Sequence, residues 1–200
     1  MQTTDHNIKK YNKYFITPDY NHDFSNEYYL KIESVLKSGI QLLQFRSKNL
    51  SVIEYSRISR KVHSICVSYK VKFIVNDYKN LESNSYCDGI QLTSENLRNI
   101  NIINIDKNYI IIASCHNINE IEICNKSKVD LVVISPVLKT KNKDGIGWEN
   151  FKKLSSFSKY PVFALGGLDY NADIEKVNKN GGIGIAASSY FYNLFNAWER

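Results

Sequence analysis

Polar residues able to bind a ligand follow directly after several short apolar runs of this sequence. The run 73–75 stops on Asn76 and Asp77 without a turn glycine. An amide and a carboxylate in that place are either a plain strand end or polar groups brought to the rim of a site. Comparable polar sets follow other runs: Gln44, Arg46 and Lys48; Ser114 and His116; and Thr140, Asn142 and Lys143.

Two further runs end in small residues, the first in Gly166 and Gly167 and the second in Ser188 and Ser189. Backbone N–H groups at such turns are a usual place for a bound phosphate. Each set also has a purely structural interpretation, since a glycine pair is commonly a tight left-handed turn and His116 could simply bond a nearby carbonyl. Their shared position at successive run ends favours a functional site.

The elements that must position these residues alternate along the chain. Continuous apolar runs of strand type occur at 14–17, 42–46, 73–76, 89–92, 110–114, 131–135, 162–165 and 184–187. Amphipathic segments of helical period lie between them, at 27–37, 53–69, 118–126, 148–157 and 173–180. Apolar strands alternating with helices predict parallel strands buried on both faces.

Eight such strands in one chain predict a compact (β/α)8 TIM barrel, an α/β fold. In this fold the C-terminal ends of the strands converge on one mouth, so the polar sets would form a ring there. The weakest parts of the pattern are 78–87, which is too short for a full helix, and the Asn-rich stretch 96–108. We expect a single domain over residues 1–200, with 1–12 either a flexible tail or a lid over the barrel bottom.

Composition and charge narrow the functional classes. Hydrophobic residues make up 43% of the 200 residues and charged residues 23%, which is typical of a globular chain. The net charge of +6 is spread over scattered lysines without an aromatic RNA-binding signature, so we expect a small anionic substrate rather than nucleic acid.

The hydropathy pattern and the cysteines indicate the cellular location of the protein. No apolar run approaches the roughly 20 residues that a membrane span requires, and the start of the chain has no signal-peptide core. We therefore expect a cytoplasmic protein without a membrane partner. The four cysteines show no CxxC pairing, which predicts reduced and separately buried thiols.

The motifs, taken in order, resemble a known family. LLQFRSK, FIVND, CDGIQL, IIASCHN, DLVVISPVLKTKNK, PVFALGGL and GGIGIAASS are similar to the motif series of the thiamine-phosphate synthase and thiazole tautomerase family. The resemblance runs from about Tyr14 to Phe191. SCHN with SPVLKT is similar in particular to the synthase-like domain fused to some Nudix hydrolases.

The resemblance implies a transferase of thiamine biosynthesis. In the synthase, hydroxymethylpyrimidine pyrophosphate loses pyrophosphate, and the nitrogen of thiazole phosphate captures the pyrimidine methylene cation. Preplaced cations would stabilise the charge on the departing pyrophosphate. The implied catalytic residues are Arg46, Lys48, Lys143, Ser114 and His116. The implied substrate-binding residues are Gln44, Asn76, Thr140, Asn142, Gly166, Gly167, Ser188 and Ser189.

Mg²⁺ is the implied cofactor, with Asp77 and Asn96 as metal ligands. Asn96 is a departure, because the synthase usually carries an acidic residue there, and an amide removes a full charge from the site. The stretch QLTSENL looks more like the tautomerase branch, in which a histidine matching His116 acts as general acid and base.

Three functions therefore remain open at the level of the sequence. They are a synthase acting on phosphorylated pyrimidine and thiazole substrates, a tautomerase that uses His116, and a non-catalytic relative that binds phosphate esters. Retention of Arg46, Lys48, Asp77 and Lys143 favours the synthase, since a tautomerase has no pyrophosphate to bind. Small barrels commonly associate, so a homo-oligomer is compatible with each.

Overall fold

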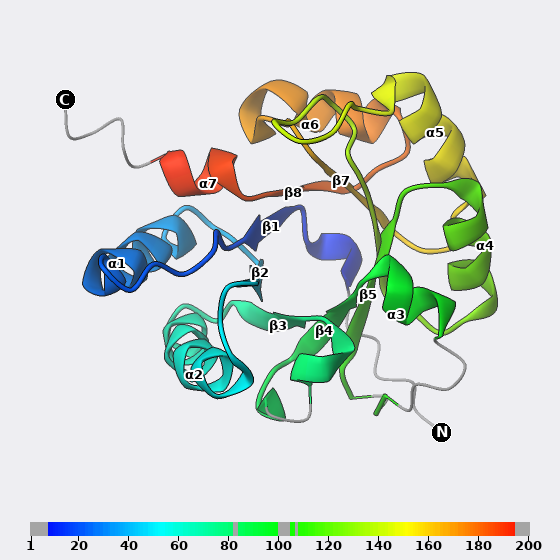
Figure 1. Ribbon diagram of the computed structural model, residues 1–200. Helices are drawn as coiled ribbons and strands as arrows, with labels where there is room; N and C mark the ends of the chain where they lie inside the picture. The colour runs from blue at the N-terminus through cyan, green and yellow to red at the C-terminus, as the bar shows by residue number, and fades with distance from the viewer. Residues whose placement is uncertain (1–7, 82–83, 100–104, 107, 195–200) are drawn as a thin grey trace.

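The computed structural model describes residues 8–81, 84–99, 105–106 and 108–194, and these residues form one closed barrel (Figure 1). Its eight parallel strands pair in sequence order, and β8 closes the ring on β1. The strands are β1 (Lys13–Ile16), β2 (Leu42–Phe45), β3 (Lys72–Asn76), β4 (Gly89–Leu92), β5 (Ile110–Cys115), β6 (Leu131–Ile134), β7 (Val162–Leu165) and β8 (Gly184–Ala187). The predicted (β/α)8 fold and all eight predicted strands are confirmed.

Helices surround the barrel on its outside (Figure 1). They are α1 (Ser25–Leu36), α2 (Val52–Ser68), α3 (Ser94–Arg98), α4 (Ile118–Lys126), α5 (Gly147–Phe157), α6 (Tyr170–Lys179) and α7 (Ser189–Asn193), with 3-10 turns η1 (Ile8–Lys10) and η2 (Tyr78–Asn80). The five predicted helices correspond to α1, α2, α4, α5 and α6. The pattern missed α3 and α7, because five residues are too few to show a helical period.

Side-chain oxygens fix where several helices begin. In α2, Ser51 accepts the N–H of Glu54, and the Glu54 carboxylate accepts the N–H of Ser51, which is a complete capping box. Asn117 and Asp169 cap α4 and α6 in the simpler way, each accepting one backbone N–H. Each such cap satisfies backbone N–H groups that a first helical turn leaves unpaired.

The core has two layers, because successive strand residues point to opposite faces. One set packs outward against the helices and includes Phe15, Phe45 and Phe73. The other set fills the barrel interior and includes Tyr14, Ile74 and Phe163. The same alternation turns polar residues toward the interior two positions further along β2, β3 and β5, where Gln44, Asn76 and Ser114 follow Leu42, Ile74 and Ile112. These strands thus place a polar layer above an apolar one.

The cysteine prediction needs one correction. All four cysteines are free and buried, as expected. Cys115 and Cys124 are not separate, however, because α4 packs its Cys124 against the end of β5 and the two Sγ atoms lie 3.5 Å apart. Burial raises the pKa of the Cys66 and Cys87 thiols, the latter to about 12, so both remain protonated near neutral pH.

No helix in the described part of the chain is long and apolar enough to cross a membrane. Among residues 1–12, the described ones begin at Ile8. Ile8 is 6% exposed and belongs to the same apolar cluster as the barrel interior. Ile8 therefore packs against the barrel while Lys9 and Lys10 are exposed, and the role of residues 1–12 as tail or lid stays a prediction because residues 1–7 lie outside the described residues.

Ile8→Ala is expected to lower the free energy of unfolding by about 2–4 kcal/mol, since it removes a buried side chain from the interior cluster. Urea denaturation of both proteins measures the difference. The matched control is Lys9→Ala, which changes an exposed neighbour in the same turn. Equal, small effects of the two substitutions would show that residues 8–10 are only a tail.

Candidate active site

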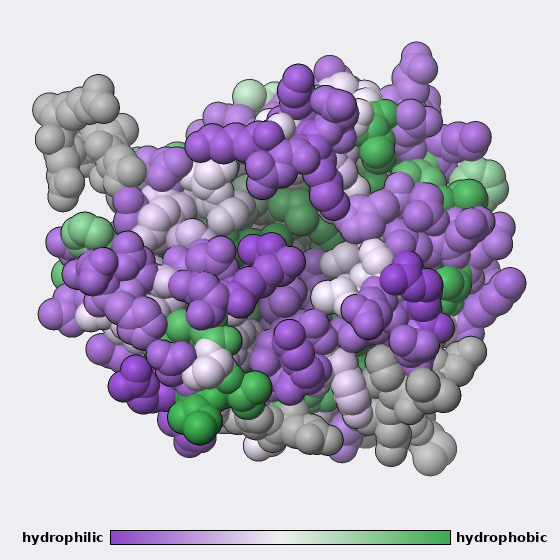
Figure 2. Space-filling view, viewed as in Figure 1, coloured by the Kyte–Doolittle hydropathy of each residue, from purple (hydrophilic) through white to green (hydrophobic). Residues whose placement is uncertain are grey.

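The C-terminal ends of the eight strands meet on one face, and the loops that follow them form its rim. The space-filling view is hollowed near its centre, with hydrophobic groups in the hollow and hydrophilic groups around it (Figure 2). Because the barrel interior below is filled by side chains such as Ile74 and Val133, a ligand could enter only this upper layer.

Gln44 lies at the end of β2 and is almost completely buried, with 1% of its surface exposed. Its Nε2 is the one buried side-chain nitrogen or oxygen without a hydrogen-bond partner in the described part of the chain. A buried donor without an acceptor typically costs about 1–3 kcal/mol. A substrate atom that accepts this hydrogen bond would remove that cost.

The predicted cations at the mouth form no ion pairs with described acids, and the Asp19 carboxylate instead accepts the backbone N–H of Lys48 at 2.9 Å. Among the described residues, no carboxylate lies within 4.0 Å of the charged groups of Arg46, Lys48 or Lys143, whereas Lys139 contacts Asp144 at 3.7 Å. Arg46 is partly buried, and its N–H donates to Thr17 Oγ1 at 3.0 Å. The β2 loop is thereby held against the end of β1, and positive charge remains available for an anion.

Asp77 follows β3 in a backbone conformation that L-residues rarely adopt, with φ 72° and ψ 139°. Its N–H donates to Gln91 O at 3.0 Å, and its carboxylate accepts the N–H of Lys79 at 3.4 Å. The Asp77 side chain is 22% exposed, and the ammonium group of Lys79 lies 4.0 Å away. Strained residues of this kind cluster at functional sites. After the run 73–75, Asp77 thus occupies the turn position where a glycine would be expected, and it adopts a conformation that glycine would adopt more easily.

Asn96 serves the local structure. Its Oδ1 accepts the N–H of Tyr78 at 3.0 Å and the N–H of Thr93 at 3.4 Å, which fixes the segment after β3 against the start of α3. Thr93 completes the capping box by accepting the N–H of Asn96. Both lone pairs of the amide oxygen are used in this way, so the metal-binding role of Asn96 stays a prediction. The described residues contain no cluster of three or more His, Cys, Asp or Glu side chains of the kind that would enclose a metal.

At the end of β5, Ser114 Oγ accepts a hydrogen bond from Gln91 Nε2 at 2.9 Å, and Gln91 Oε1 in turn accepts from Tyr14 Oη at 2.7 Å. The ring Nδ1 of His116 lies 2.5 Å from the backbone oxygen of Ser135, and the backbone N–H of His116 donates to the Glu120 carboxylate at 2.6 Å. A carbonyl only accepts, so Nδ1 carries a proton, and Nε2 bears the lone pair in the neutral ring. The structural interpretation of His116, a bond to a nearby carbonyl, is confirmed.

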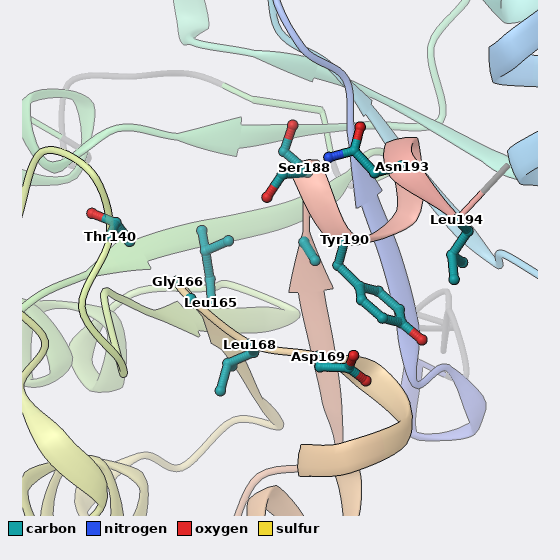
Figure 3. A pocket seen from close by; sticks show the side chains of 12 residues that line it. Thr140, Leu165, Gly166, Leu168, Asp169, Ser188, Tyr190, Asn193 and Leu194 are labelled. Carbon is teal, nitrogen blue, oxygen red and sulfur yellow. The ribbon is translucent and has the colours of Figure 1, made fainter. Parts of the chain in front are cut away.

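Five of the predicted residues line one cavity of about 660 Å³ on the β6–β8 side of the mouth: Thr140, Gly166, Gly167, Ser188 and Ser189. Figure 3 shows Thr140 facing this cavity from the β6 loop, across from Ser188 and Tyr190. Thr140 Oγ1 accepts the N–H of Lys143 at 3.1 Å, so a tight turn that contains exposed Asn142 holds these two residues together.

The two glycines of this cavity have positive φ angles, 105° at Gly166 and 69° at Gly167. A side chain would also collide with the β6 loop, because a Cβ at Gly167 would lie 2.6 Å from Lys139 O and one at Gly166 would lie 2.6 Å from Pro136. The tight-turn interpretation is therefore confirmed. The same geometry leaves backbone groups open to the cavity, as a phosphate cradle requires.

Residues of this chain match a known protein family. Residues 13–191 match the family model described as thiamine monophosphate synthase. The chain belongs to the thiamine monophosphate synthase family. It is 31% identical over 149 residues to a thiamine-phosphate synthase of Fusobacterium nucleatum, covering 72% of each chain. It is 28% identical over 163 residues to a putative thiamine-phosphate synthase 2 of Aquifex aeolicus, covering 80% of this chain and 87% of the relative.

Structural comparison gives a similar result. The thiamine phosphate pyrophosphorylase of Pyrococcus furiosus superposes with a TM-score of 0.77 at 26% identity, covering 96% of this chain and 92% of that one. The matches cover 72–92% of these three relatives, so the barrel corresponds to most of each of them. None of the three names mentions a Nudix hydrolase: two are named as thiamine-phosphate synthases and the third as a thiamine phosphate pyrophosphorylase.

The structure thus divides the predicted residues between two parts of the mouth. The cavity described above holds one group, and Gln44, Asn76 and Ser114 come from β2, β3 and β5 outside its lining. Four residues were not predicted from the sequence: Tyr190 and Asn193 of α7, which line the cavity, and Gln91 and Tyr14, of which Gln91 bonds both Tyr14 and Ser114. Gln91 carried a detectable signal, because it is a polar residue inside a predicted buried strand.

The backbone at Asp77 predicts an unusual order of stabilities. Asp77→Gly should be more stable than Asp77→Ala by about 1 kcal/mol, since glycine adopts a positive φ without strain. Urea denaturation of the two variants measures this order. Both variants lose the carboxylate, so both should lose any metal-dependent activity.

The matched control is the same pair of substitutions at Glu175, an exposed position inside α6. There alanine should be the more stable residue by about 1 kcal/mol, because glycine disfavours a helix interior. If alanine were favoured at both positions, Asp77 would not hold the strained conformation in solution.

Proposed function

We propose that this protein is a thiamine-phosphate synthase, a cytoplasmic transferase that joins hydroxymethylpyrimidine pyrophosphate and thiazole phosphate to give thiamine phosphate and pyrophosphate. The observation that carries the proposal is the set of side-chain cations at the mouth, Arg46, Lys48 and Lys143, with no described carboxylate within 4.0 Å. Arg46 is partly buried, whereas Lys48 and Lys143 are exposed, and together the three cations favour a polyanionic ligand. Family membership supplies the identity of that ligand.

The cations act on the bond that breaks. As the carbon–oxygen bond of the pyrimidine pyrophosphate ionises, negative charge accumulates on the leaving pyrophosphate. Arg46 offers a planar fork to two of its oxygens, while Lys48 and Lys143 act as point charges. These contacts strengthen as the charge develops, so they lower the barrier rather than only tightening substrate binding.

Neutral donors orient the two substrates. Gln44 Nε2 has no protein acceptor and would donate to the pyrimidine substrate. Asn76 would fix phosphate position through its amide, and Thr140 with Asn142 would close the β6 side. The turns at Gly166–Gly167 and Ser188–Ser189 line the cavity in which the thiazole phosphate would lie.

The mouth offers Mg²⁺ a single predicted carboxylate. Mg²⁺ typically uses one or two carboxylates together with substrate phosphate oxygens, and Asp77 is a strained, 22% exposed carboxylate at the mouth. Asp77 would hold the ion; the second predicted position, Asn96, already uses both lone pairs of Oδ1 for the N–H groups of Tyr78 and Thr93. When bound, Mg²⁺ would neutralise part of the pyrophosphate charge. A site with a single carboxylate would fill mainly together with the substrate.

The decisive experiment is a thiochrome fluorescence assay for thiamine phosphate. Purified protein with both substrates should form product at a rate that rises with added Mg²⁺ and falls to background in chelator. Asp77→Ala should reduce the rate at least a hundredfold, since metal and leaving group lose their shared contact. Asp77→Ala with unchanged turnover would remove Asp77 from the metal site.

The same samples distinguish the alternatives, which no observation here favours. His116→Ala should abolish a tautomerase but only weaken a synthase, because His116 is not needed for ionisation of the pyrophosphate. A folded wild-type protein that forms no thiamine phosphate at high Mg²⁺, yet isomerises a thiazole carboxylate phosphate in a His116-dependent way, would overturn the proposal. Pyrophosphate binding without turnover of either substrate would indicate a binding relative.

Asn96→Asp is expected to lower the Mg²⁺ concentration for half-maximal activity by about threefold or more, because one added carboxylate strengthens a hard-cation site. Aspartate can keep the capping contacts of Oδ1, while its second oxygen would replace Nδ2. The Mg²⁺ titration of the thiochrome assay measures the shift. Asn99→Asp, an exposed position at the far end of α3, is the control of equal charge. An identical Mg²⁺ dependence of both variants would exclude position 96 from the site.

A further inference from the structure

Three polar side chains from different strands form a hydrogen-bonded chain across the barrel interior. Tyr14 on β1 donates from Oη to Gln91 Oε1 at 2.7 Å, and Gln91 on β4 donates from Nε2 to Ser114 Oγ at 2.9 Å. Tyr14 is 0% exposed and Gln91 is 5% exposed. Ser114 is only partly buried, so the chain begins in the closed interior and ends at the mouth.

The closed end sets the direction of both bonds. Burial raises the pKa of Tyr14 well above its ordinary value, so its hydroxyl keeps its proton. A buried hydroxyl hydrogen needs an acceptor, and within the described part of the chain Gln91 Oε1 is the one it reaches. If the Gln91 amide were turned over, its N–H₂ would face the hydroxyl and the phenol hydrogen would lose that acceptor. The amide therefore presents its oxygen to Tyr14 and its nitrogen to Ser114.

This direction determines what Ser114 can offer a ligand. A serine hydroxyl has one hydrogen to donate and two lone pairs that accept. Gln91 Nε2 occupies a lone pair and has no lone pair of its own to take the hydroxyl hydrogen. The hydrogen of Ser114 is thus left to point elsewhere, toward the mouth, where Gln44 Nε2 is a second donor without a protein acceptor.

We propose that Tyr14 and Gln91 are positioning residues that hold Ser114 as a hydrogen-bond donor to the substrate. Ser114 donates to an acceptor atom of the pyrimidine pyrophosphate, either a ring nitrogen or a pyrophosphate oxygen. The inference rests on the proposed function, because it requires that substrate at the mouth. It adds to it a specificity rule: the substrate atom that meets the Ser114 hydrogen must be an acceptor, since an analogue with a donor there would leave that hydrogen unpaired.

A double-mutant cycle tests this coupling. In the wild-type background, Tyr14→Phe should lower kcat/KM about five- to twentyfold, because Gln91 is then free to turn over and Ser114 loses its orientation. In a Ser114→Ala background, Tyr14→Phe should change kcat/KM by less than about twofold. Equal losses in the two backgrounds would mean that Tyr14 acts by general stability and would overturn the proposal.

A matched control distinguishes an effect on the orientation of Ser114 from an effect on the stability of the fold. Tyr160→Phe also removes a hydroxyl that donates a hydrogen bond, in this case to the backbone oxygen of Ser127 at 2.6 Å, but Tyr160 lies between α5 and β7, at the opposite end of the barrel. It should change kcat/KM by less than about twofold, whatever its effect on thermal unfolding. Retained kcat/KM in Tyr14→Phe would contradict the proposal.

Gln91→Glu provides a readout that a merely structural role would not change. A protonated carboxyl has the same shape and the same donor and acceptor pattern as the amide, whereas a carboxylate only accepts and would capture the Ser114 hydrogen. The activity of Gln91→Glu relative to wild type should therefore rise as pH falls. Asp77 and His116, at the ends of the flanking strands, and Tyr14 are present in both proteins, so the ratio isolates residue 91. A ratio independent of pH would overturn the assigned direction.

The outcomes also separate this inference from the proposed function. Product formation by wild type with no effect of Ser114→Ala would leave the synthase intact and overturn the role of Ser114. If wild type forms no product, the proposed function fails, and calorimetric binding of hydroxymethylpyrimidine pyrophosphate to the same four proteins of the cycle decides the inference. Coupling in affinity between Tyr14 and Ser114 would support it, and independent effects would overturn it.

Discussion

The structure of the mouth depends on one geometric constraint, the strict alternation of side chains along eight strands that close on each other. In an open sheet a polar residue can turn toward water at an edge, but a closed parallel barrel has no edge and both strand faces are buried. Apolar residues such as Ile74 and Phe163 fill the lower interior. Every polar residue on the same face must then find a partner or lie at the open end.

Two buried amides meet this requirement in different ways. Gln91 satisfies both ends of its side chain, with Tyr14 on one side and Ser114 on the other. Gln44 keeps Nε2 unpaired. In an interior of low dielectric constant, a satisfied network is rigid and an unsatisfied donor is costly. Rigid positioning and a donor without an acceptor are complementary features of a site prepared for a polar ligand.

Backbone conformation at the rim adds a second layer of constraint. Asp77 holds a conformation with φ 72° that glycine would adopt more easily, and Gly166 and Gly167 allow the β6 and β7 loops to approach each other closely. The strained conformation of Asp77 and the close packing at the two glycines both keep backbone and side-chain groups directed at the mouth. The cations Arg46, Lys48 and Lys143 form no ion pairs with described acids at this same rim.

The sequence by itself determined the barrel and the positions of its strands, because period and apolar content reflect burial directly. It also placed Gln44, Asn76 and Ser114 near the C-terminal ends of strands, as the structure has them, while their part in a site stays a prediction. It could not determine that the oxygen of Asn96 is taken by Tyr78 and Thr93, or that Cys115 touches Cys124. Nor could it show that Tyr14 reaches Gln91, 77 positions further along the chain. Those contacts join residues far apart along the chain or fix the direction of a hydrogen bond, and only closure of the barrel sets the distances between strands on which both depend.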